Sequence, residues 1–158
     1  MEEEIVEGWF FQDQLLNPEQ IPEKAIAFLY IITHKESGKW YIGRKNLTKP
    51  TYKTVKGKKK KTMVQSDWPT YWSSSPYLQE WVEKDGKEKF KREILIFVET
   101  AAATLYAEEA LLYLTGGLFD EKCINGHIRT KVMRSWFLKK EADIHSRIIS
   151  LPLFAKPQ

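Results

Sequence analysis

Apolar, aromatic and β-branched residues are concentrated in two neighbouring segments in the first third of the chain. These segments are 25–33 (AIAFLYIIT) and 39–44 (KWYIGR). They predict a β-hairpin, because strands favour aromatic and β-branched residues and Gly38 can adopt the positive φ of a tight turn. Tyr30 is then expected opposite a residue between 41 and 43. The side chains of Tyr30 and Tyr41 should therefore be neighbours.

Four further segments have a clear period. Residues 90–99 (FKREILIFVE) alternate, which predicts a third strand. Helical spacing predicts a short helix from Pro76 to Gly86, a second over 101–114 with Thr100 as its cap, and a final amphipathic helix over roughly 131–148. The predicted fold class is α+β, with a small, three-stranded, largely antiparallel sheet flanked by helices and a C-terminal amphipathic helix.

The remaining segments lack a sustained period. Residues 1–24 contain Pro18 and Pro22 among acids, which predicts an irregular acidic N-terminal arm, and residues 45–75 predict a long loop with a structured end. The expected organisation is the arm 1–24, one domain over 25–128 with a lysine-rich insertion at 45–65, and a C-terminal helix and tail over 129–158 packed on the same domain.

Length and composition narrow the protein class. A chain of 158 residues fits one domain, and its 21 aromatic residues provide material for a core. No apolar run reaches the roughly 18 residues that span a bilayer, and the start is acidic where a signal peptide is basic. A single cysteine, Cys123, is compatible with a reducing compartment. We therefore expect an intracellular, cytoplasmic protein that binds no membrane.

The net charge of +4 is distributed unevenly. Residues 1–24 carry seven acids and one base, whereas residues 39–65 carry ten bases and no acid. Such a segment suits a polyanion, because each neutralised phosphate releases condensed counterions, and DNA is the expected partner. The alternative is a solvated loop. The candidate DNA-binding residues are Lys45, Lys53, Lys58, Lys59, Lys60 and Lys61.

The order of the motifs resembles the GIY-YIG nuclease superfamily. Phe28, Leu29 and Tyr30 stand where the first half of the name motif is expected, and Tyr41, Ile42 and Gly43 match its second half. The segments SDWPTYWSSS, KFKREIL, LYAEEALLY and CINGHI resemble a branch of small, mostly phage-encoded members that are similar to homing endonucleases. The resemblance covers roughly residues 25–128 and, if the chain is phage-encoded, implies the host cytoplasm.

This resemblance implies roles for four side chains. It implies that Tyr30 and Tyr41 orient or deprotonate the attacking water, and it does not distinguish which is the base. Glu108 is the implied ligand of Mg²⁺ or Mn²⁺, with Glu109 the alternative if the alignment shifts by one residue. Glu108 has leucines at i−3, i+3 and i+4, on the face that the helix should bury. The late Asn of the family matches Asn125, which would orient the site.

The basic partner departs from the family pattern. Family members carry an arginine on a helix after YIG, and the corresponding place here is Thr51. Arg44 is our first choice for this role, followed by Lys45, with Arg92 on the predicted third strand as a more distant candidate. Since Arg44 shares its strand face with buried Ile42, we expect the strand to end or bulge near Gly43, where a phosphate could also approach.

The sequence therefore predicts a magnesium-dependent DNA endonuclease of GIY-YIG type that uses a tyrosine-activated water. Phe28 in place of the first Gly and the missing helical arginine favour an alternative, a catalytically degenerate nucleic-acid-binding protein of the same fold. A virion accessory protein that uses the acidic arm is a third hypothesis. The chain has no room for a large recognition domain, so specificity should be limited or arise from a homodimer.

Overall fold

Three antiparallel strands form the centre of the structure, which is a computed structural model describing residues 7–128 and 134–155. They are β3 (Ala27–His34), β4 (Trp40–Asn46) and β7 (Phe90–Val98), in the order β7-β3-β4. The predicted hairpin and third strand are confirmed. Gly38 has φ 70° in the turn. Tyr30 is directly opposite Gly43, within the predicted window.

The sheet has five strands, so the three-stranded prediction was wrong in number. Residues placed in an irregular arm form β1 (Trp9–Phe11), which is parallel to β7, and β2 (Gln14–Leu15), followed by a short 3₁₀ helix, η1 (Pro18–Gln20). β1 joins the sheet because its first residue, Trp9, belongs to the core and is only 3% exposed. Its ring packs on those of Phe28 and Tyr30, with centroids 5.1 and 5.3 Å away. Phe11, Leu16, Ile21 and Ala25 of the same segment pack against this cluster as well.

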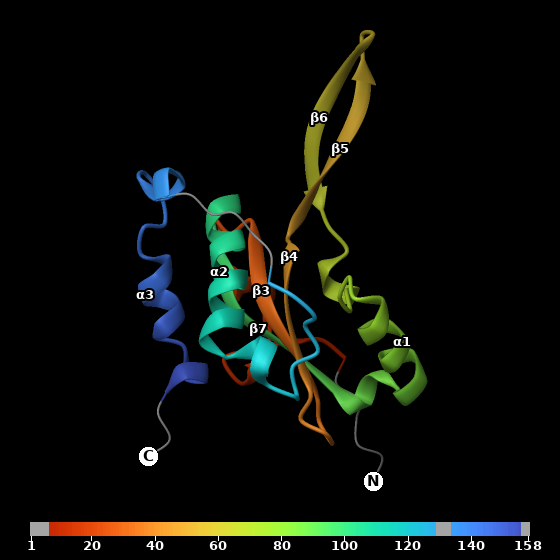
Figure 1. Cartoon of the computed structure of the whole chain (residues 1–158). Helices are drawn as coiled ribbons and strands as arrows, with labels where there is room; N and C mark the ends of the chain where they lie inside the picture. Colours follow the sequence, from red (N-terminus) through yellow and green to blue (C-terminus); the bar gives the residue numbers. More distant parts are fainter. Residues whose placement is uncertain (1–6, 129–133, 156–158) are drawn as a thin grey trace.

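The lysine-rich segment is a β-hairpin and not the predicted loop. It consists of β5 (Thr48–Val55) and β6 (Lys58–Gln65), which form a separate two-stranded sheet that we call the ribbon. Its threonines, valines and tyrosine favour strands. Lys56 and Gly57 close it with φ 50° and 76°, as in a type I′ turn. The ribbon projects from the rest of the described chain, which we call the body (Figure 1).

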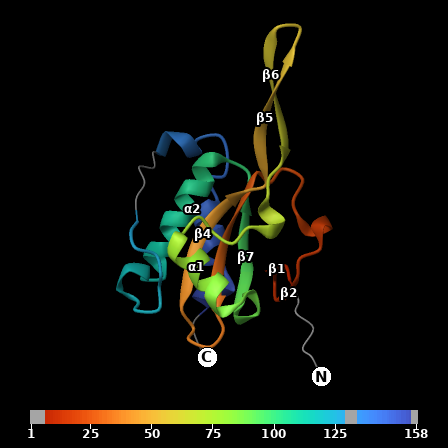
Figure 2. The same cartoon turned by 90° about the vertical axis from the view of Figure 1, so that its right-hand side faces the viewer.

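Two helices cover opposite faces of the sheet, as Figures 1 and 2 show together. The helix α1 (Pro76–Asp85) begins at the cap Ser75 and ends at Gly86, and α2 (Ala101–Leu114) begins at the cap Thr100. Both predicted helices are confirmed. Side-chain alternation on β3 divides the core into two clusters, because successive side chains point to opposite faces. Leu29 packs in the cluster with α2, and Phe28, Tyr30 and Ile32 pack in the cluster with α1.

Short 3₁₀ helices complete the connections, namely η2 (Trp68–Thr70), η3 (Lys87–Lys89) and η4 (Gly117–Phe119). The predicted continuous helix over roughly 131–148 lies partly outside the described residues, and the described part differs from it. The chain forms η5 (Arg134–Phe137), α3 (Ile144–Ile149) and η6 (Pro152–Phe154). Between η5 and α3, Glu141 has φ 52°, which interrupts a helix. In the described ranges, no helix has the length and apolar character that crossing a membrane requires.

A carboxylate from the C-terminal segment explains this interruption. Glu141 Oε1 accepts hydrogen bonds from the backbone N–H of Glu99 and the hydroxyl of Thr100, at 2.9 and 2.7 Å. Its other oxygen pairs with Arg147 at 3.0 Å, and Arg147 also donates to the carbonyl of Phe97. Ile144 and Ile148 are buried in the cluster with α2. The segment therefore attaches to the body where β7 ends and α2 begins.

Candidate active site

A cleft of 630 Å³ opens at the free edge of β4, between the start of α1 and the middle of α2. Its lining residues are Tyr41, Arg44, Ser74, Ser75, Pro76, Glu108, Glu109, Leu112, Ile124, Asn125, Gly126 and His127. Because β4 is the last strand of the sheet, side chains from its two faces can meet around the edge. Tyr41 comes from the face covered by α1, and Arg44 from the face covered by α2.

Arg44 and Glu108 form an ion pair inside this cleft. Arg44 Nε lies 3.2 Å from Glu108 Oε2, and the two side chains are 44% and 23% exposed. Burial raises the pKa of Glu108, which Arg44 opposes. The strand needs no bulge to bring Arg44 here, because the register of β3 and β4 runs without interruption to Asn46. The expected bulge was wrong: Arg44 shares the face of Ile42, and that face is the one α2 covers.

The two adjacent acids of α2 both line the cleft, but their contacts differ. Glu108 faces Arg44. Glu109 lies near enough to raise the pKa of Glu108, and the nearby His127 acts in the opposite direction. Glu108 is thus the acid that pairs with Arg44, and the choice between the two acids as metal ligand stays a prediction.

The two tyrosines are neighbours, with ring centroids 6.3 Å apart, but only one lines the cleft. Tyr30 is 1% exposed, and burial strongly raises its pKa. Tyr41 is half-buried, and its pKa is raised mainly by burial. Both hydroxyls interact with Ser73. Any water in the cleft can therefore reach Tyr41, with Tyr30 lying behind it.

Gly43 is required by Tyr30 rather than by an approaching phosphate, contrary to our expectation. The Tyr30 ring crosses the β3–β4 pair above Gly43. A Cβ at this position would lie 2.5 Å from Cζ of Tyr30 and 3.0 Å from Cε1 of Tyr41. A side chain here would overlap Tyr30 and push against Tyr41. The glycine of the YIG motif thus lets the two tyrosine rings pack together.

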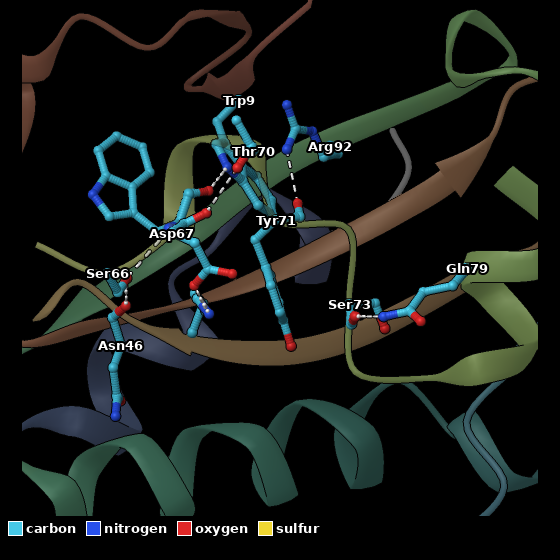
Figure 3. Close-up of polar contacts among 11 residues, drawn as sticks. Trp9, Asn46, Ser66, Asp67, Thr70, Tyr71, Ser73, Gln79 and Arg92 are labelled. Atoms are coloured by element: carbon cyan, nitrogen blue, oxygen red, sulfur yellow. Dashed lines mark hydrogen bonds and ion pairs between the residues drawn. The ribbon is translucent and has the colours of Figure 1, made fainter. Parts of the chain in front are cut away.

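The loop from 66 to 75 contacts both tyrosines through Ser73, and polar contacts hold the loop in place (Figure 3). Ser66 Oγ donates to the carbonyl of Asn46 at 2.6 Å, and Trp9 Nε1 donates to the carbonyl of Trp68 at 2.8 Å. Ser73 is fully buried with φ 98°, and Gln79 Nε2 donates to its carbonyl at 2.6 Å. A non-glycine residue held in this region is strained and persists because its surroundings fix it.

Asn125 joins the late loop to the edge of β4. Its Oδ1 accepts from the N–H of Ile42 at 2.9 Å, and its Nδ2 donates to the carbonyl of Ile42 at 2.8 Å. Just before it, the N–H of Ile124 donates to the carbonyl of Trp40. The amide side chain thus acts as one further backbone pair on the strand edge, and the cleft opens beyond it. Asn125 therefore holds the edge of β4 next to the cleft.

The other two basic residues considered for the role of the family arginine lie outside the cleft lining. Lys45 Nζ pairs with Asp67 at 2.6 Å and lies 3.9 Å from the ring centroid of Tyr71. Arg92 is 4% exposed, lies between the rings of Trp9 and Trp72, and donates to the carbonyl of Tyr71 at 2.7 Å. Burial lowers the pKa of Arg92 to about 10, so it is still charged at neutral pH. Its contacts hold the 66–75 loop.

The remaining candidates lie on the ribbon or in the core. Lys53 and the run 58–61 are exposed on β5 and β6. Thr51, at the place of the family arginine, is on the ribbon as well. Phe28, which replaces the first motif glycine, is fully buried and packs edge-to-face on Trp9, Trp68 and Phe97. This departure from the motif therefore serves core packing.

Three cleft residues with polar side chains were missed as site candidates by the sequence analysis, namely Ser74, Ser75 and His127. The run of three serines before Pro76 was visible, but it was interpreted only as the end of a loop. His127 stands two residues after Asn125, so its proximity to the motif asparagine was the available signal. The contacts that bring these segments to α2 are long-range and have no local pattern.

The donor set fits a hydrated magnesium ion rather than a caged one. In residues 7–128 and 134–155, no group of three or more His, Cys, Asp or Glu side chains could hold a metal. Glu108 offers a hard carboxylate oxygen in an open cleft. Mg²⁺ commonly binds through one or two carboxylates while keeping several waters and substrate phosphate oxygens as ligands. Glu108 therefore meets the minimum requirement for such a site.

One family comparison bears on this cleft. The family model described as "Putative endonuclease segE, GIY-YIG domain" matches residues 9–128, which is more than half of the chain. The matched span begins at β1, so it includes the two strands that the sequence analysis assigned to an arm, as well as the ribbon and every cleft residue. No curated protein and no solved structure matches the chain significantly.

Proposed function

The chain belongs to the GIY-YIG domain family of the segE endonucleases, and from this premise we propose that it hydrolyses phosphodiester bonds of DNA in the cleft at the β4 edge. One observation carries the proposal. The same cleft is lined by Tyr41, Arg44 and Glu108. The first two come from opposite faces of β4, and Glu108 comes from α2, 64 positions after Arg44 in the sequence. A half-buried hydroxyl, a guanidinium and a carboxylate around one opening suit hydrolysis of a charged ester.

Tyr41 orients the attacking water. Its pKa is raised above the ordinary value of a tyrosine, chiefly by burial. It therefore keeps its proton at neutral pH, and its hydroxyl oxygen accepts a hydrogen bond from the water. Tyr30, buried behind it, fixes the ring of Tyr41 by packing across Gly43. Of the two roles open to the tyrosines, orientation is thus the one that these environments favour for Tyr41.

Arg44 supplies positive charge to the phosphate on which negative charge develops. It is positioned by its ion pair with Glu108, and nearly half of its side chain remains exposed to the cleft. A guanidinium can donate to two phosphate oxygens at once. One preorganised donor of this kind contributes about 10²- to 10³-fold to a rate. Arg44 thus takes the place of the helical arginine that the family carries elsewhere.

Glu108 is the residue that would hold Mg²⁺, or Mn²⁺ in its place. When bound, a divalent cation supplies charge neutralisation at the phosphate and at the leaving oxygen. The raised pKa of Glu108 reflects a carboxylate that burial disfavours as an anion. A cation beside it offsets that cost, as Arg44 already does in part. Asn125 keeps the β4 edge in place next to this carboxylate.

The ribbon provides the DNA contacts. Lys53 and the lysines at 58–61 are exposed, and in the described part of the chain no ion pair involves them. Lysines of this kind bind phosphates without reading sequence. Lys45 instead contributes by holding Asp67, and so the 66–75 loop.

Incubation of supercoiled plasmid with the full chain tests the proposal. We expect nicked and then linear DNA in Mg²⁺ or Mn²⁺ and none with a chelator in excess. Tyr41→Phe should remove the hydroxyl while keeping the ring, and should slow cleavage with unchanged DNA affinity. A wild-type chain that binds plasmid without cutting it in either metal would contradict hydrolysis.

That outcome would support the second candidate, a protein of this fold that binds nucleic acid without cutting it. One observation favours this candidate. The position of the family arginine, Thr51, lies on the ribbon, so Arg44 is the one arginine of the described residues that lines the cleft. If Arg44 serves only to neutralise Glu108, the described part of the cleft lining has no other arginine to bind the phosphate. The plasmid assay separates the two candidates directly.

A further inference from the structure

The ribbon carries lysines on both of its faces. In an antiparallel pair, directly opposed residues share a face and successive residues alternate. Lys53 is opposite Lys60, and Lys58 is opposite Val55, so these lysines share one face with Lys49. Lys59 and Lys61, opposite Thr54 and Tyr52, lie on the other face. The ribbon is therefore basic on each side, and it contains no acid.

This arrangement is unfavourable without a ligand. Like charges directly opposite each other destabilise a strand pair, and Lys53 and Lys60 are such a pair. The remaining ribbon surface gives no compensation, because every residue of β6 is exposed. A polyanion on both sides would turn this repulsion into attraction. A polyanion on one side would leave the lysines of the other face without a partner.

We infer that the ribbon lies in the major groove of duplex DNA, with each face directed at the phosphates of one strand. This inference rests on the proposed action on DNA. The major groove, about 12 Å wide, admits a two-stranded ribbon, whereas the minor groove, about 6 Å wide, does not. The two-residue turn at Lys56 and Gly57 makes the tip as narrow as a hairpin allows, and a Cβ at Gly57 would meet no atom within 4 Å.

A continuous surface joins the ribbon to the cleft. A second hollow, of 650 Å³, is lined at the ribbon base by Thr48, Lys49, Pro50 and Met63, and in the body by α2 residues. Arg44 lines both this hollow and the cleft. A DNA strand leaving the cleft past Arg44 therefore meets the base of the ribbon next. The ribbon and the cleft can engage one duplex.

The length of the ribbon sets how far this contact extends. Eight residues per strand span about 26 Å at about 3.3 Å per residue. This corresponds to about eight base-pair steps of about 3.4 Å each. Since there is one ribbon in the described chain and it projects from the body in one direction (Figure 1), the groove contact extends to one side of the scissile phosphate.

Paired variants test the two faces separately. We would measure binding of a 30-base-pair duplex by fluorescence anisotropy over a range of salt concentrations, with chelator and in a Glu108→Ala background to prevent cleavage. The variants are Lys53→Gln with Lys60→Gln on one face, and Lys59→Gln with Lys61→Gln on the other. Lys84→Gln with Lys87→Gln, exposed beyond the ribbon, removes the same charge as a control.

Groove insertion predicts that each ribbon pair lowers the slope of log affinity against log salt by up to about 1.8, at about 0.9 per lost phosphate contact. The control pair should leave the slope unchanged. A decrease for one ribbon pair alone would overturn the inference in favour of a ribbon lying flat on the outside of the duplex. An unchanged slope for both ribbon pairs would show that the ribbon lysines are solvated surface residues that do not contact DNA.

Competition identifies the groove. Methyl green, which occupies the major groove, should weaken binding of the wild-type chain, and netropsin, which occupies the minor groove, should not. The reverse result would overturn the assignment to the major groove. Plasmid cleavage by the wild-type chain is measured in parallel. If the wild-type chain cleaves plasmid and the ribbon variants leave the salt slopes unchanged, the ribbon inference fails and the proposed nuclease activity stands. If the slopes change and no cleavage is seen, the ribbon inference stands and the proposed nuclease activity fails.

Discussion

The body and the ribbon of this molecule use charged residues in opposite ways. In the body, Arg44 pairs with Glu108, Arg92 lies between two tryptophans and donates to carbonyls, and Arg147 pairs with Glu141. On the ribbon, the lysines at 58–61 are exposed and form no ion pair within the described residues.

This difference follows from what each region has to do. Chemistry at a phosphate requires donors that are already in place when charge develops, which is the role proposed for the paired Arg44, whereas Arg92 and Arg147 hold segments of the body together. Binding a polyanion requires charge near phosphates and tolerates mobile side chains. Under the proposed function, the paired charge of the cleft and the unpaired charges of the ribbon serve different steps, cleavage and binding. It also predicts that variants of the two regions will separate cleavage from affinity.

Replacing the cleft carboxylate should give the largest effect. Glu108→Ala should lower the cleavage rate by about 10³-fold, the upper end for the loss of one preorganised charged group, and change DNA affinity by less than a few-fold. Single-turnover cleavage of plasmid and anisotropy with the same DNA measure the two quantities. Glu109→Ala is the matched control. If Glu109→Ala stops cleavage and Glu108→Ala does not, the two acids have exchanged roles.

Removing the cleft arginine should have the next largest effect. Arg44→Ala should slow cleavage by about 10²-fold, because one donor to the phosphate is lost and Glu108 loses its partner. Arg92→Ala should instead act on stability, since it leaves the carbonyls of Pro69 and Tyr71 without their donor. Chemical denaturation and single-turnover rates on the folded fraction distinguish them. An unchanged rate for Arg44→Ala would remove it from the chemistry.

A methyl group at the YIG glycine should destabilise the body. Gly43→Ala places a Cβ against the rings of Tyr30 and Tyr41, so we expect a loss of about 2 kcal/mol in the free energy of unfolding. Gly126→Ala is the control, because its Cβ would meet open space. Urea denaturation measures both. Equal stabilities for the two variants would show that the tyrosine rings move aside without cost.

Shortening the ribbon should affect the body least. Thr51 and Thr62 are direct partners, so residues 52–61 can be replaced by Asn-Gly, which suits a two-residue hairpin turn. We expect the free energy of unfolding to change by less than about 0.5 kcal/mol. Duplex affinity should fall at least about tenfold. A marked loss of stability would mean that the ribbon supports the core, and the contrast between the two regions would then fail.

The sequence was most informative where local chemistry decides structure. The hairpin, the third strand and the two longer helices each have a period, a cap or a turn glycine, such as Ser75, Thr100 and Gly38. The ribbon was missed because its strands have no apolar face. A segment exposed on both sides lacks the alternation that reveals a half-buried strand. The threonines and valines of the two strands were the weaker signal that remained.

The site could be predicted in its components and not in its arrangement. Tyr41, Arg44 and Glu108 were selected from motif order, and the structure brings them to one cleft. Which tyrosine reaches the cleft depends on burial by Trp9, a residue assigned to an irregular arm. Which side of β4 faces α2 depends on the whole sheet, so the difficulty expected for Arg44 did not exist. Such facts are tertiary and have no local signature.

The hydrogen bonds between Asn125 and Ile42 also bear on the order in which parts of the molecule can form. They join residues 83 positions apart, whereas the ribbon closes at its own two-residue turn. A chain is made from its N-terminus, and local hairpins form within about 1–10 μs. The basic ribbon is therefore synthesised before Glu108 and Asn125. If the proposed function holds, the part of the chain that contacts DNA is therefore made before the part that cuts it is complete.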